Sequence, residues 1–579
     1  MASQTQPTSA ATTIVPSQPT SRAQSLKGNK EAGALEQAEA PASTKPLDVH
    51  VDQGQRPVSK DRAPVFVVVL CLFQSLAGLL FGWESGGISG LVNCRDYQMR
   101  FGTVDPTSVT GYSIPSTRQA LITSFMGLGA LFGSLLAGRI SGKLGIKVAY
   151  LISLVIFLIG VAIELSSMTQ WGQMLAGRFI AGYGVGALSM LAPLYQAECS
   201  PKHLRGMITS TYQLCATFGI FFANVVNYKM HDVDGPLSWR LTIALQLVWG
   251  AFVLVGTVFC PESPRYYVMR GNIDQARINL GKLRDLAPGD EELEAEIQEY
   301  VARQKEEEAA GDASYIDCFR SEGRMGLRTA IGIAVQAGQQ WSGVNFFFSY
   351  GVKFFAAAGI SDSFLIQVIL GAVNVISTFP GLLAVEKLGR RQTLFIGSFI
   401  MFTGQVVAGA LGTAYPDGEV AGKILITFSC IYIFGFASSW GPLGWVVAAE
   451  QFPVRMAPYC VAFATGSNWL NNFILAMITP YITDAGYGNL QAKITFIWAA
   501  AIVLFTAFVF FFVPETKGLS LVQVDELYLS RVPAWRSSSW VPFGGASKRN
   551  ATDGGSLKLQ TTQKHHENVQ PRNLDDDEE

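Results

Sequence analysis

Apolar runs of about 20 residues recur along the chain, and this is the length at which an α-helix crosses the hydrocarbon core of a bilayer. Six runs precede a long polar stretch and six follow it. The pattern predicts an all-α membrane protein with twelve transmembrane helices in two sets of six. The expected spans are 65–92, 119–141, 147–168, 172–195, 207–229 and 239–260, then 327–350, 364–385, 392–413, 423–448, 458–480 and 492–513.

The segments outside these runs are polar. Residues 1–64 are rich in Ser, Thr, Gln, Pro and Ala without hydrophobic periodicity, which predicts a disordered cytosolic tail. Residues 261–326 hold charged stretches with helical spacing, which predicts short amphipathic helices on the cytosolic face between the bundles 65–260 and 327–513. A partner-binding role is the alternative for this linker. Residues 514–579 form the predicted cytosolic C-tail.

Positive charge predicts the orientation of the chain. An even number of spans places both tails on the same side of the membrane. Lys and Arg are concentrated in the alternate short loops that share this side, and positive charge favours the cytosolic side. The first apolar residue of the first run is Val65, too far along for the core of a cleavable signal peptide. We therefore expect a multi-pass protein of the plasma membrane with both termini in the cytosol.

Composition narrows the class of function. Of 579 residues, 49% are hydrophobic and only 15% are charged, whereas soluble globular chains carry about 25% charged residues. A soluble enzyme is therefore excluded. The formal net charge of −1 gives no argument for binding nucleic acid. The eight cysteines form no CxxC pair and the five histidines lie in polar segments, so we expect no metal centre and no cofactor.

The two halves repeat each other. Three pairs of motifs are separated by about 250 residues, as expected of two parallel six-helix repeats around a midplane site. The pairs are Gly142-Lys-Leu-Gly-Ile-Lys147 with Glu386-Lys-Leu-Gly-Arg-Arg391, Glu198-x-x-Pro201 with Glu450-x-x-Pro453, and Pro261-Glu-Ser-Pro-Arg265 with Pro514-Glu-Thr-Lys-Gly518.

Taken in order, these and other motifs resemble the sugar porters of the major facilitator superfamily, most closely fungal and plant monosaccharide transporters. The resemblance covers roughly residues 65–530 and implies alternating access, in which two six-helix bundles rock about a central hexose site. The matching stretches are Gly78–Leu91, Gly177–Ala187, Pro193-x-Tyr195-x-x-Glu198, Pro261–Arg265, Gln339–Asn345, Glu386–Arg391, Gly441–Trp445 and Pro514–Leu519.

A hexose is an uncharged polyol, so its site needs neutral donors and acceptors in an apolar cavity, with flat rings against its C–H faces. The predicted spans supply amides and a Trp of this kind. Hydrogen bonding between helices is the alternative for each amide. The resemblance places Gln213, Gln339, Gln340, Asn345, Asn374 and Trp445 at sugar-contact positions, with Asn472 as a further contact and Asn468 left outside this set.

Two ionisable residues in the first half are candidates for proton coupling. Glu84 and Arg178 lie inside predicted spans, where charged residues are costly and mark function. The resemblance implies that they face each other, and that proton-coupled relatives carry an Asp where Glu84 stands. A permanent ion pair is the alternative, and it would leave a passive carrier. We expect Glu164, near the outer end of its span, to reach the headgroups instead.

Charged residues of the cytosolic motifs are candidates for gating. Pairs between the bundles, made only when the inner side is shut, can bias a transport equilibrium. Gly142 and Ile146 stand where relatives carry an acidic residue and an Arg, which weakens the network in the first half. The candidates are Glu198, Arg205, Glu386, Arg390, Arg391, Glu450 and Arg455.

The sequence thus predicts a transporter of a monosaccharide, glucose or a related hexose, that works by proton symport. Its expected partners are the sugar, protons and the lipid bilayer, with no nucleic acid, and its expected transport unit is a monomer. Two alternatives stay open: an uncoupled hexose carrier, and a glucose sensor that signals through its tail. The tail from Glu526 to Glu579 contains no recognisable signalling module.

Overall fold

The computed structural model describes residues 65–542, except 107, 109, 201–203, 310–313, 358–361, 415–418, 454 and 485. The predicted tail 1–64 and the C-tail from residue 543 lie outside the described residues. The described chain belongs to one compact unit that is mostly helical.

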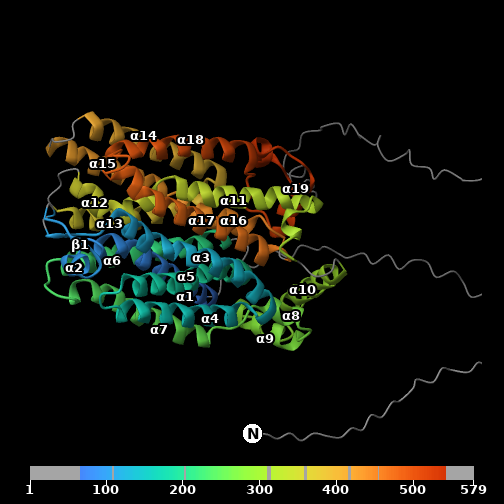
Figure 1. Ribbon diagram of the computed structural model, residues 1–579. Helices are drawn as coiled ribbons and strands as arrows, with labels where there is room; N and C mark the ends of the chain where they lie inside the picture. The colour runs from blue at the N-terminus through green and yellow to red at the C-terminus, as the bar shows by residue number, and fades with distance from the viewer. Residues whose placement is uncertain are drawn as a thin grey trace, which may run out of the picture. The chain divides into compact units, whose positions relative to one another are not determined.

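The first half contains six long helices that match the first six expected spans. Between the first two of them lie a short helix, α2 (Arg95–Phe101), and an antiparallel hairpin of β1 (Thr103–Val104) and β2 (Tyr112–Ser113). We call the end of the bundle that carries α2 and β1 the hairpin end (Figure 1). The long helices are α1 (Val65–Leu91), α3 (Ser116–Leu144), α4 (Ile146–Ser166), α5 (Trp171–Cys199), α6 (Arg205–Met230) and α7 (Leu237–Phe259).

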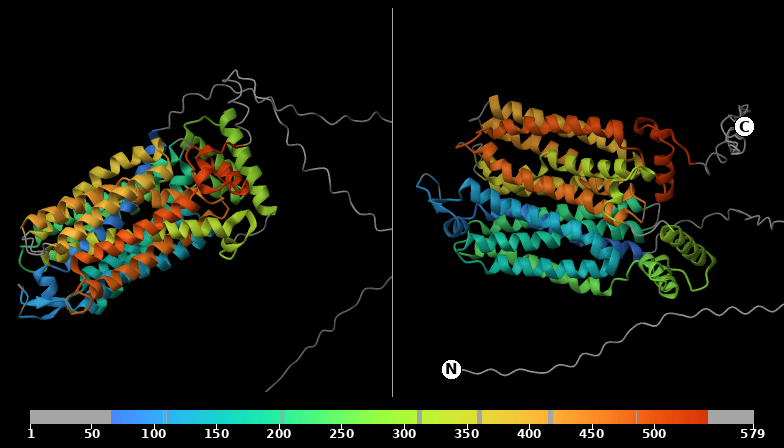
Figure 2. Two further views of the ribbon diagram at one scale, coloured as in Figure 1. Left: turned by 90° about the horizontal axis from the view of Figure 1, so that it is seen from above. Right: turned by 45° about the vertical axis from the view of Figure 1, so that its right-hand side comes forward.

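Short helices occupy the predicted linker, as its helical spacing indicates. They are α8 (Pro264–Met269), α9 (Ile273–Arg284) and α10 (Glu291–Ala309), followed by the 3₁₀ turns η1 (Asp317–Phe319) and η2 (Glu322–Arg324). Their apolar faces pack on one another through Val268, Ala276, Leu280, Leu293 and Ile297. Figures 1 and 2 show these helices at the end opposite the hairpin, which we call the linker end.

Helix α19 (Leu521–Leu529) lies within the segment assigned to the C-tail, and η4 (Ala534–Ser539) follows it. Ser520 and Gln523 form a capping box at its start. The Tyr528 hydroxyl donates to Gln451 Oε1 at 2.8 Å. This part of the tail is therefore folded against the bundle, at the linker end (Figure 2).

The second half contains two broken helices where the sequence predicts single spans. Expected span 327–350 is divided into α11 (Met325–Trp341) and α12 (Val344–Ala357), and 423–448 into α15 (Glu419–Ala437) and α16 (Trp440–Glu450). Gly343 adopts φ +93°, a left-handed conformation that glycine permits. Pro442 has no N–H to donate to the carbonyl of Ser438, which lies in the second break. The other helices are α13 (Ser363–Lys387), α14 (Arg390–Ala414), α17 (Ala457–Thr483) and α18 (Ile494–Phe512), the last preceded by η3 (Gln491–Lys493).

Within the described residues, nine helical segments are long and apolar enough to cross a membrane. The expected spans outside this set are those of α6, α11–α12 and α17. Amides lower the hydropathy of α6 and α17, and the break leaves α11 (17 residues) and α12 (14 residues) each too short to cross a membrane alone. Exposed apolar side chains such as Phe259, Phe399 and Leu504 lie instead on α7, α14 and α18, where they suit contact with lipid. The nine segments are Val65–Leu91, Ser116–Leu144, Ile146–Ser166, Trp171–Cys199, Leu237–Phe259, Ser363–Lys387, Arg390–Ala414, Gly422–Glu450 and Gln491–Phe512.

The two halves use the same contact to start a helix. The Glu262 carboxylate accepts from the backbone N–H groups of Ile146 (3.1 Å) and Lys147 (3.0 Å) at the start of α4. Glu515 accepts from those of Arg390 (2.9 Å) and Arg391 (3.0 Å) at the start of α14. Burial raises the pKa of Glu262, and these N–H groups oppose the rise because they favour the ionised form. The repeated Pro-Glu motifs therefore cap corresponding helices.

Glycines let α1 and α6 approach closely. A Cβ on Gly82 would lie 1.8 Å from the carbonyl oxygen of Ala216, whereas a Cβ on Gly87 would meet nothing nearer than Thr242 Cγ2 at 3.5 Å. We expect Gly82→Ala to destabilise the protein by about 1–3 kcal/mol, the usual cost of overpacking. The melting temperature of the purified protein should fall. Gly87→Ala on the same helix is the matched control, and equal melting temperatures for both variants would contradict the close approach.

Candidate functional site

Amides of α11 and α17 form one hydrogen-bond network. Gln336, Gln339 and Gln340 share a face of α11, because residues three and four apart are neighbours on a helix. Asn468 Nδ2 donates to Gln336 Oε1 (2.6 Å) and Gln339 Oε1 (2.7 Å). Gln340 Nε2 donates to Asn468 Oδ1 (2.8 Å), and Asn345 Nδ2 of α12 donates to Gln340 Oε1. The predicted residues Gln339, Gln340 and Asn345 thus lie together.

The network continues to the broken helix α16. Gln339 Nε2 donates to the carbonyl oxygens of Trp440 (3.1 Å) and Gly441 (2.8 Å). A Cβ on Gly444 would lie 2.6 Å from Gln339 Nε2, so only glycine allows this approach. The Gly441–Trp445 motif therefore serves to bring α16 against the amides of α11.

Trp445 joins the two halves. Its indole Nε1 donates to Gln213 Oε1 of α6 at 3.0 Å, and both side chains are buried. The Trp445 ring meets Tyr212 edge-on at 5.2 Å, and Phe81 meets Trp469 at 5.1 Å. Flat rings and neutral amides therefore lie side by side between α1, α6, α16 and α17.

Asn374 and Asn472 complete the predicted set. Asn374 of α13 is buried, and neither of its amide atoms has a hydrogen-bond partner among the described residues. Such a group is a candidate for contact with a ligand, because buried polar atoms are normally satisfied. Asn472 of α17 faces α3, where a Cβ on Gly127 would lie 2.9 Å from its Oδ1.

Glu84 and Arg178 form a buried ion pair between α1 and α5. Arg178 Nη1 lies 3.0 Å from Glu84 Oε1, and both side chains are almost completely buried. Within the described chain neither oxygen of Glu84 makes a hydrogen bond of good geometry, and Arg178 Nε has no partner. The pair is therefore close in distance but incompletely hydrogen-bonded.

The expectation that Glu164 reaches the headgroups is wrong. Its side chain is 1% exposed and packs against α5, where a Cβ on Gly177 would lie 2.6 Å from Glu164 Cγ. The absence of a side chain at Gly177 creates the space that Glu164 occupies. Its carboxylate interacts electrostatically with both Glu84 and Arg178.

Three of the gating candidates meet at the linker end of the second half. Arg390 donates to Glu450 through Nε (3.0 Å) and Nη2 (2.6 Å), a two-pronged pair. A Cβ on Gly206, at the start of α6, would lie 2.5 Å from both Glu386 Oε1 and Arg390 Nη2. The first half therefore touches this cluster through α6.

Arg391 points elsewhere. Its guanidinium donates to the carbonyl oxygens of Val509 (3.1 Å) and Phe510 (3.1 Å), near the end of α18. A cation at a helix C-terminus satisfies carbonyls that have no partner inside the helix. In this structure Arg391 holds α14 to α18 within one half.

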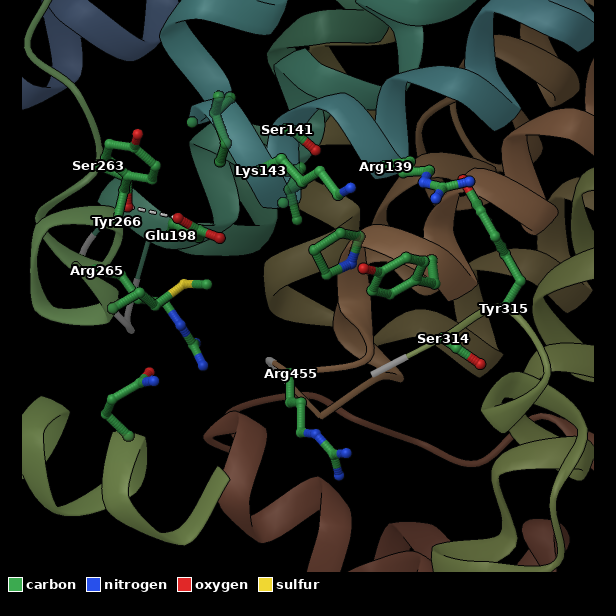
Figure 3. A pocket seen from close by; sticks show the side chains of 18 of the residues that line it. Arg139, Ser141, Lys143, Glu198, Ser263, Arg265, Tyr266, Ser314, Tyr315 and Arg455 are labelled. Atoms are coloured by element: carbon green, nitrogen blue, oxygen red, sulfur yellow. Dashed lines mark hydrogen bonds between the residues drawn. The ribbon is translucent and has the colours of Figure 1, made fainter. Parts of the chain in front are cut away.

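Two further gating candidates, Glu198 and Arg455, line a cavity at the linker end. Its volume is about 810 Å³, and it is lined by residues of both halves and the linker, including Arg139, Lys143, Glu198, Tyr315 and Arg455. Figure 3 shows Glu198 and Arg455 on separate parts of its wall, with Glu198 accepting from Ser263 Oγ at 2.5 Å. Burial raises the pKa of Tyr315 to about 12. Arg205 is the first residue of α6.

Polar contacts also join the halves at the hairpin end. Lys353 Nζ of α12 lies 2.9 Å from Asp484 and 3.3 Å from Gln119 Oε1 of α3. Ser116 Oγ donates to Asp484 Oδ2 at 2.5 Å, and the Val352 N–H donates to Ser89 Oγ of α1 at 3.1 Å. These contacts join α1 and α3 of the first half to α12 and the end of α17 in the second half.

We expect Glu386→Ala to slow turnover more than it changes sugar affinity, because Glu386 contacts the other half and not the amides. The expected loss is about fivefold, which corresponds to about 1 kcal/mol. Initial rates over a range of sugar concentrations measure both quantities. Lys387→Ala removes the exposed neighbour and should change neither. A Glu386→Ala variant with a normal maximal rate and poor affinity would contradict the gating assignment.

Sequence reasoning missed three residues of the site. Gln336 lies three and four residues before Gln339 and Gln340, and this spacing indicates that the three side chains share one face of the helix. Asn468 lies outside the predicted set but at the centre of the network. Glu164 had no such signal, because its burial depends on the rotation of α4 against α5.

Comparison with known proteins finds sugar transporters that are similar in sequence over most of the chain. The family model described as "Sugar (and other) transporter" matches residues 70–528. Hexose transporter 2 of Kluyveromyces lactis is 36% identical over 511 residues, 86% of this chain and 89% of that protein. The low-affinity glucose transporter HXT3 of Saccharomyces cerevisiae is 37% identical over 488 residues, 83% of this chain and 85% of that protein.

Solved structures of similar fold are also sugar transporters. The proton:xylose symporter XylE bound to 6-bromo-6-deoxy-D-glucose has a TM-score of 0.69 and 25% identity, covering 81% of this chain and 100% of that chain. An inward open conformation of XylE from E. coli has a TM-score of 0.61 and 26% identity, covering 80% of this chain and 99% of that chain. The similar proteins are transporters rather than enzymes.

Proposed function

Because the chain belongs to the family of sugar transporters, we propose that it carries glucose or a related hexose across the plasma membrane by alternating access. The observation that carries the proposal is the Trp445–Gln213 hydrogen bond beside the amide network of α11 and α17. It brings neutral donors, acceptors and a ring together where the two halves meet. The hexose transporters of yeasts at 36–37% identity support a hexose as substrate.

The proposed topology has twelve transmembrane crossings in two six-helix repeats. In addition to the nine apolar segments, α6, α17 and the broken pair α11–α12 cross the membrane with their amides facing inward. The shared capping by Glu262 and Glu515 supports the repeat. Basic residues such as Arg139, Lys143 and Arg390 lie near the linker end, so this end and both termini face the cytosol. The transport unit is a monomer.

Alternating access requires contacts that are made in one conformation and broken in another. The contacts of Lys353, Asp484 and Ser116 seal the hairpin end, and those of Gly206 with Glu386 and Arg390 join the halves at the linker end. The amides of α11 and α17 form hydrogen bonds with one another. A hexose that enters replaces these hydrogen bonds with its hydroxyl groups, at little net cost.

Proton coupling is the finer part of the proposal. The carboxylate of Glu84 is buried and lies 3.0 Å from Arg178, so binding a proton there breaks the ion pair. A rocking motion that changes the separation of α1 and α5 ties proton release to the transport step. XylE, whose solved structure has a similar fold, is a proton:xylose symporter, which supports this mechanism.

The 3.0 Å separation of Glu84 and Arg178 also favours a second candidate, an uncoupled hexose carrier. Glu is one methylene longer than the Asp that the resemblance implies for proton-coupled relatives, so the pair can persist through the transport cycle. In that case the pair only holds α1 and α5 together, and sugar equilibrates without accumulation.

The test is uptake of labelled glucose in a host that lacks its own hexose carriers. We expect saturable uptake that unlabelled glucose competes away. An empty vector is the control, together with measurement of the protein at the cell surface. Absence of uptake at normal surface expression would contradict transport and would favour a glucose sensor.

A further inference from the structure

A second carboxylate stands beside the Glu84–Arg178 pair. Glu164 of α4 fills the gap that Gly177 leaves on α5, one residue before Arg178. Its side chain is 1% exposed, and its Oε1 has no partner in the part of the chain that the structure describes. It interacts electrostatically with both members of the pair. The carboxylates of Glu84 and Glu164 therefore both interact with the Arg178 guanidinium.

The groups that face this cluster do not balance its charge. Tyr97 of α2 and Tyr350 of α12 approach Arg178, but a phenol is neutral at ordinary pH. Tyr350 donates to the carbonyl of Ala476 at 2.5 Å. Arg240 of α7 donates to the carbonyl of Ser167 at 2.8 Å and stacks on Trp239. It is therefore engaged at the end of α4.

With both carboxylates ionised, the cluster would carry a net charge of −1 away from water. An uncompensated buried charge is strongly unfavourable. One bound proton brings the net charge to zero. It also converts a carboxyl oxygen into a donor, in a place where Glu84, Glu164 and the Tyr97 hydroxyl all have unsatisfied atoms.

We propose that Glu164 is a second proton-binding carboxyl, which shares one proton with Glu84 around Arg178. The proton arrives from a hydronium ion, forms an O–H bond on one of the two carboxyl groups and leaves a water molecule behind. Its release to water on the other side reverses this step. This inference rests on the proposed proton coupling. It adds Glu164, whose negative charge allows a proton to bind next to the Arg178 guanidinium.

The position of the cluster connects it with both the hairpin end and the sugar site. Tyr97 covers it from α2, which is anchored by the hydrogen bond from Trp239 Nε1 to Asp96 Oδ2 at 2.9 Å. Tyr350 belongs to α12, the helix that also carries Asn345. The helix that carries Asn345 therefore also faces the proposed proton site through Tyr350.

The test replaces Glu164 by Gln, which keeps the shape and cannot ionise. The remaining Glu84–Arg178 pair is neutral as an ion pair and needs no bound proton to balance its charge. We expect the pH profile of sugar accumulation to shift by at least one unit towards acid, equivalent to a tenfold loss of proton affinity. Asp232→Asn, which alters an exposed carboxylate at the hairpin end, is the control and should leave the profile unchanged. Identical profiles for wild type and Glu164→Gln would overturn the proposal.

Infrared spectroscopy of the purified protein provides a readout that does not depend on transport. The wild type should show the C=O band of a protonated, deuterium-exchangeable carboxylic acid near neutral pH, and Glu164→Gln should lose it. Glu164→Asp should keep both the band and accumulation, and loss of both would contradict a role for the carboxyl group. A wild type that shows this band but only equilibrates sugar would refute the coupling and uphold the shared proton. A wild type without the band would refute the shared proton.

Discussion

Replacing Glu84 by Gln should abolish uphill accumulation of sugar while leaving exchange down the gradient. The amide cannot ionise, so its protonation state no longer changes with the separation from Arg178. One charge that crosses 100 mV supplies about 2.3 kcal/mol, enough for roughly fiftyfold accumulation. That factor should fall to about one in the variant. Uptake to steady state, with and without an uncoupler, measures it.

Two comparisons make this result specific. The uncoupler should lower accumulation by the wild type and leave Glu84→Gln unaffected. Asp232→Asn should behave like the wild type, because its carboxylate is exposed and pairs with His231 rather than with Arg178. Accumulation by Glu84→Gln equal to that of the wild type would remove Glu84 from the coupling mechanism.

Truncating Gln340 or Asn345 to Ala should weaken apparent sugar affinity by roughly ten- to a hundredfold. Each change leaves a sugar hydroxyl without a partner in a dry site, at about 1–3 kcal/mol per lost hydrogen bond. Gln340→Ala also removes the partner of Asn468 Oδ1. Half-saturation concentrations from initial uptake rates measure the effect, and insertion into the membrane should not change.

Asn471→Ala is the matched control for these two variants. Asn471 also lies on α17, but it accepts from Trp341 Nε1 at 2.8 Å and stands outside the amide network. We expect its half-saturation concentration to stay within about threefold of the wild type, the effect of less than about 1 kcal/mol. Unaltered half-saturation in both Gln340→Ala and Asn345→Ala would exclude these residues from the sugar site.

The positions of the long helices could be predicted because membrane burial imposes long apolar runs. The breaks could not be predicted from hydropathy, because the apolar pattern continues across them. The break before Val344 depends on Gly343 at positive φ, and the one before Trp440 on a pair of serines and Pro442. Both are local backbone features that involve only a few residues, and both lie beside the amide network.

The candidate site could be predicted in part. The type and spacing of Gln339, Gln340 and Asn345 indicated a polar cluster, and the structure brings these three together. Their contact with sugar remains a prediction. The position of Glu164 could not be predicted, because its depth along α4 says nothing about its rotation towards α5. Gly177 leaves the space that the Glu164 side chain fills, and only the packing of the two helices shows it.

The central claim is that the chain itself moves a hexose across a membrane. The most direct measurement is uptake of labelled glucose by purified protein in liposomes with an imposed proton gradient, acid outside and negative inside. We expect glucose to accumulate above equilibrium and to leave when an uncoupler is added. Glucose that equilibrates across the liposome membrane without accumulating would indicate an uncoupled hexose carrier. Liposomes that contain inserted, folded protein and take up no more glucose than empty ones would contradict the account.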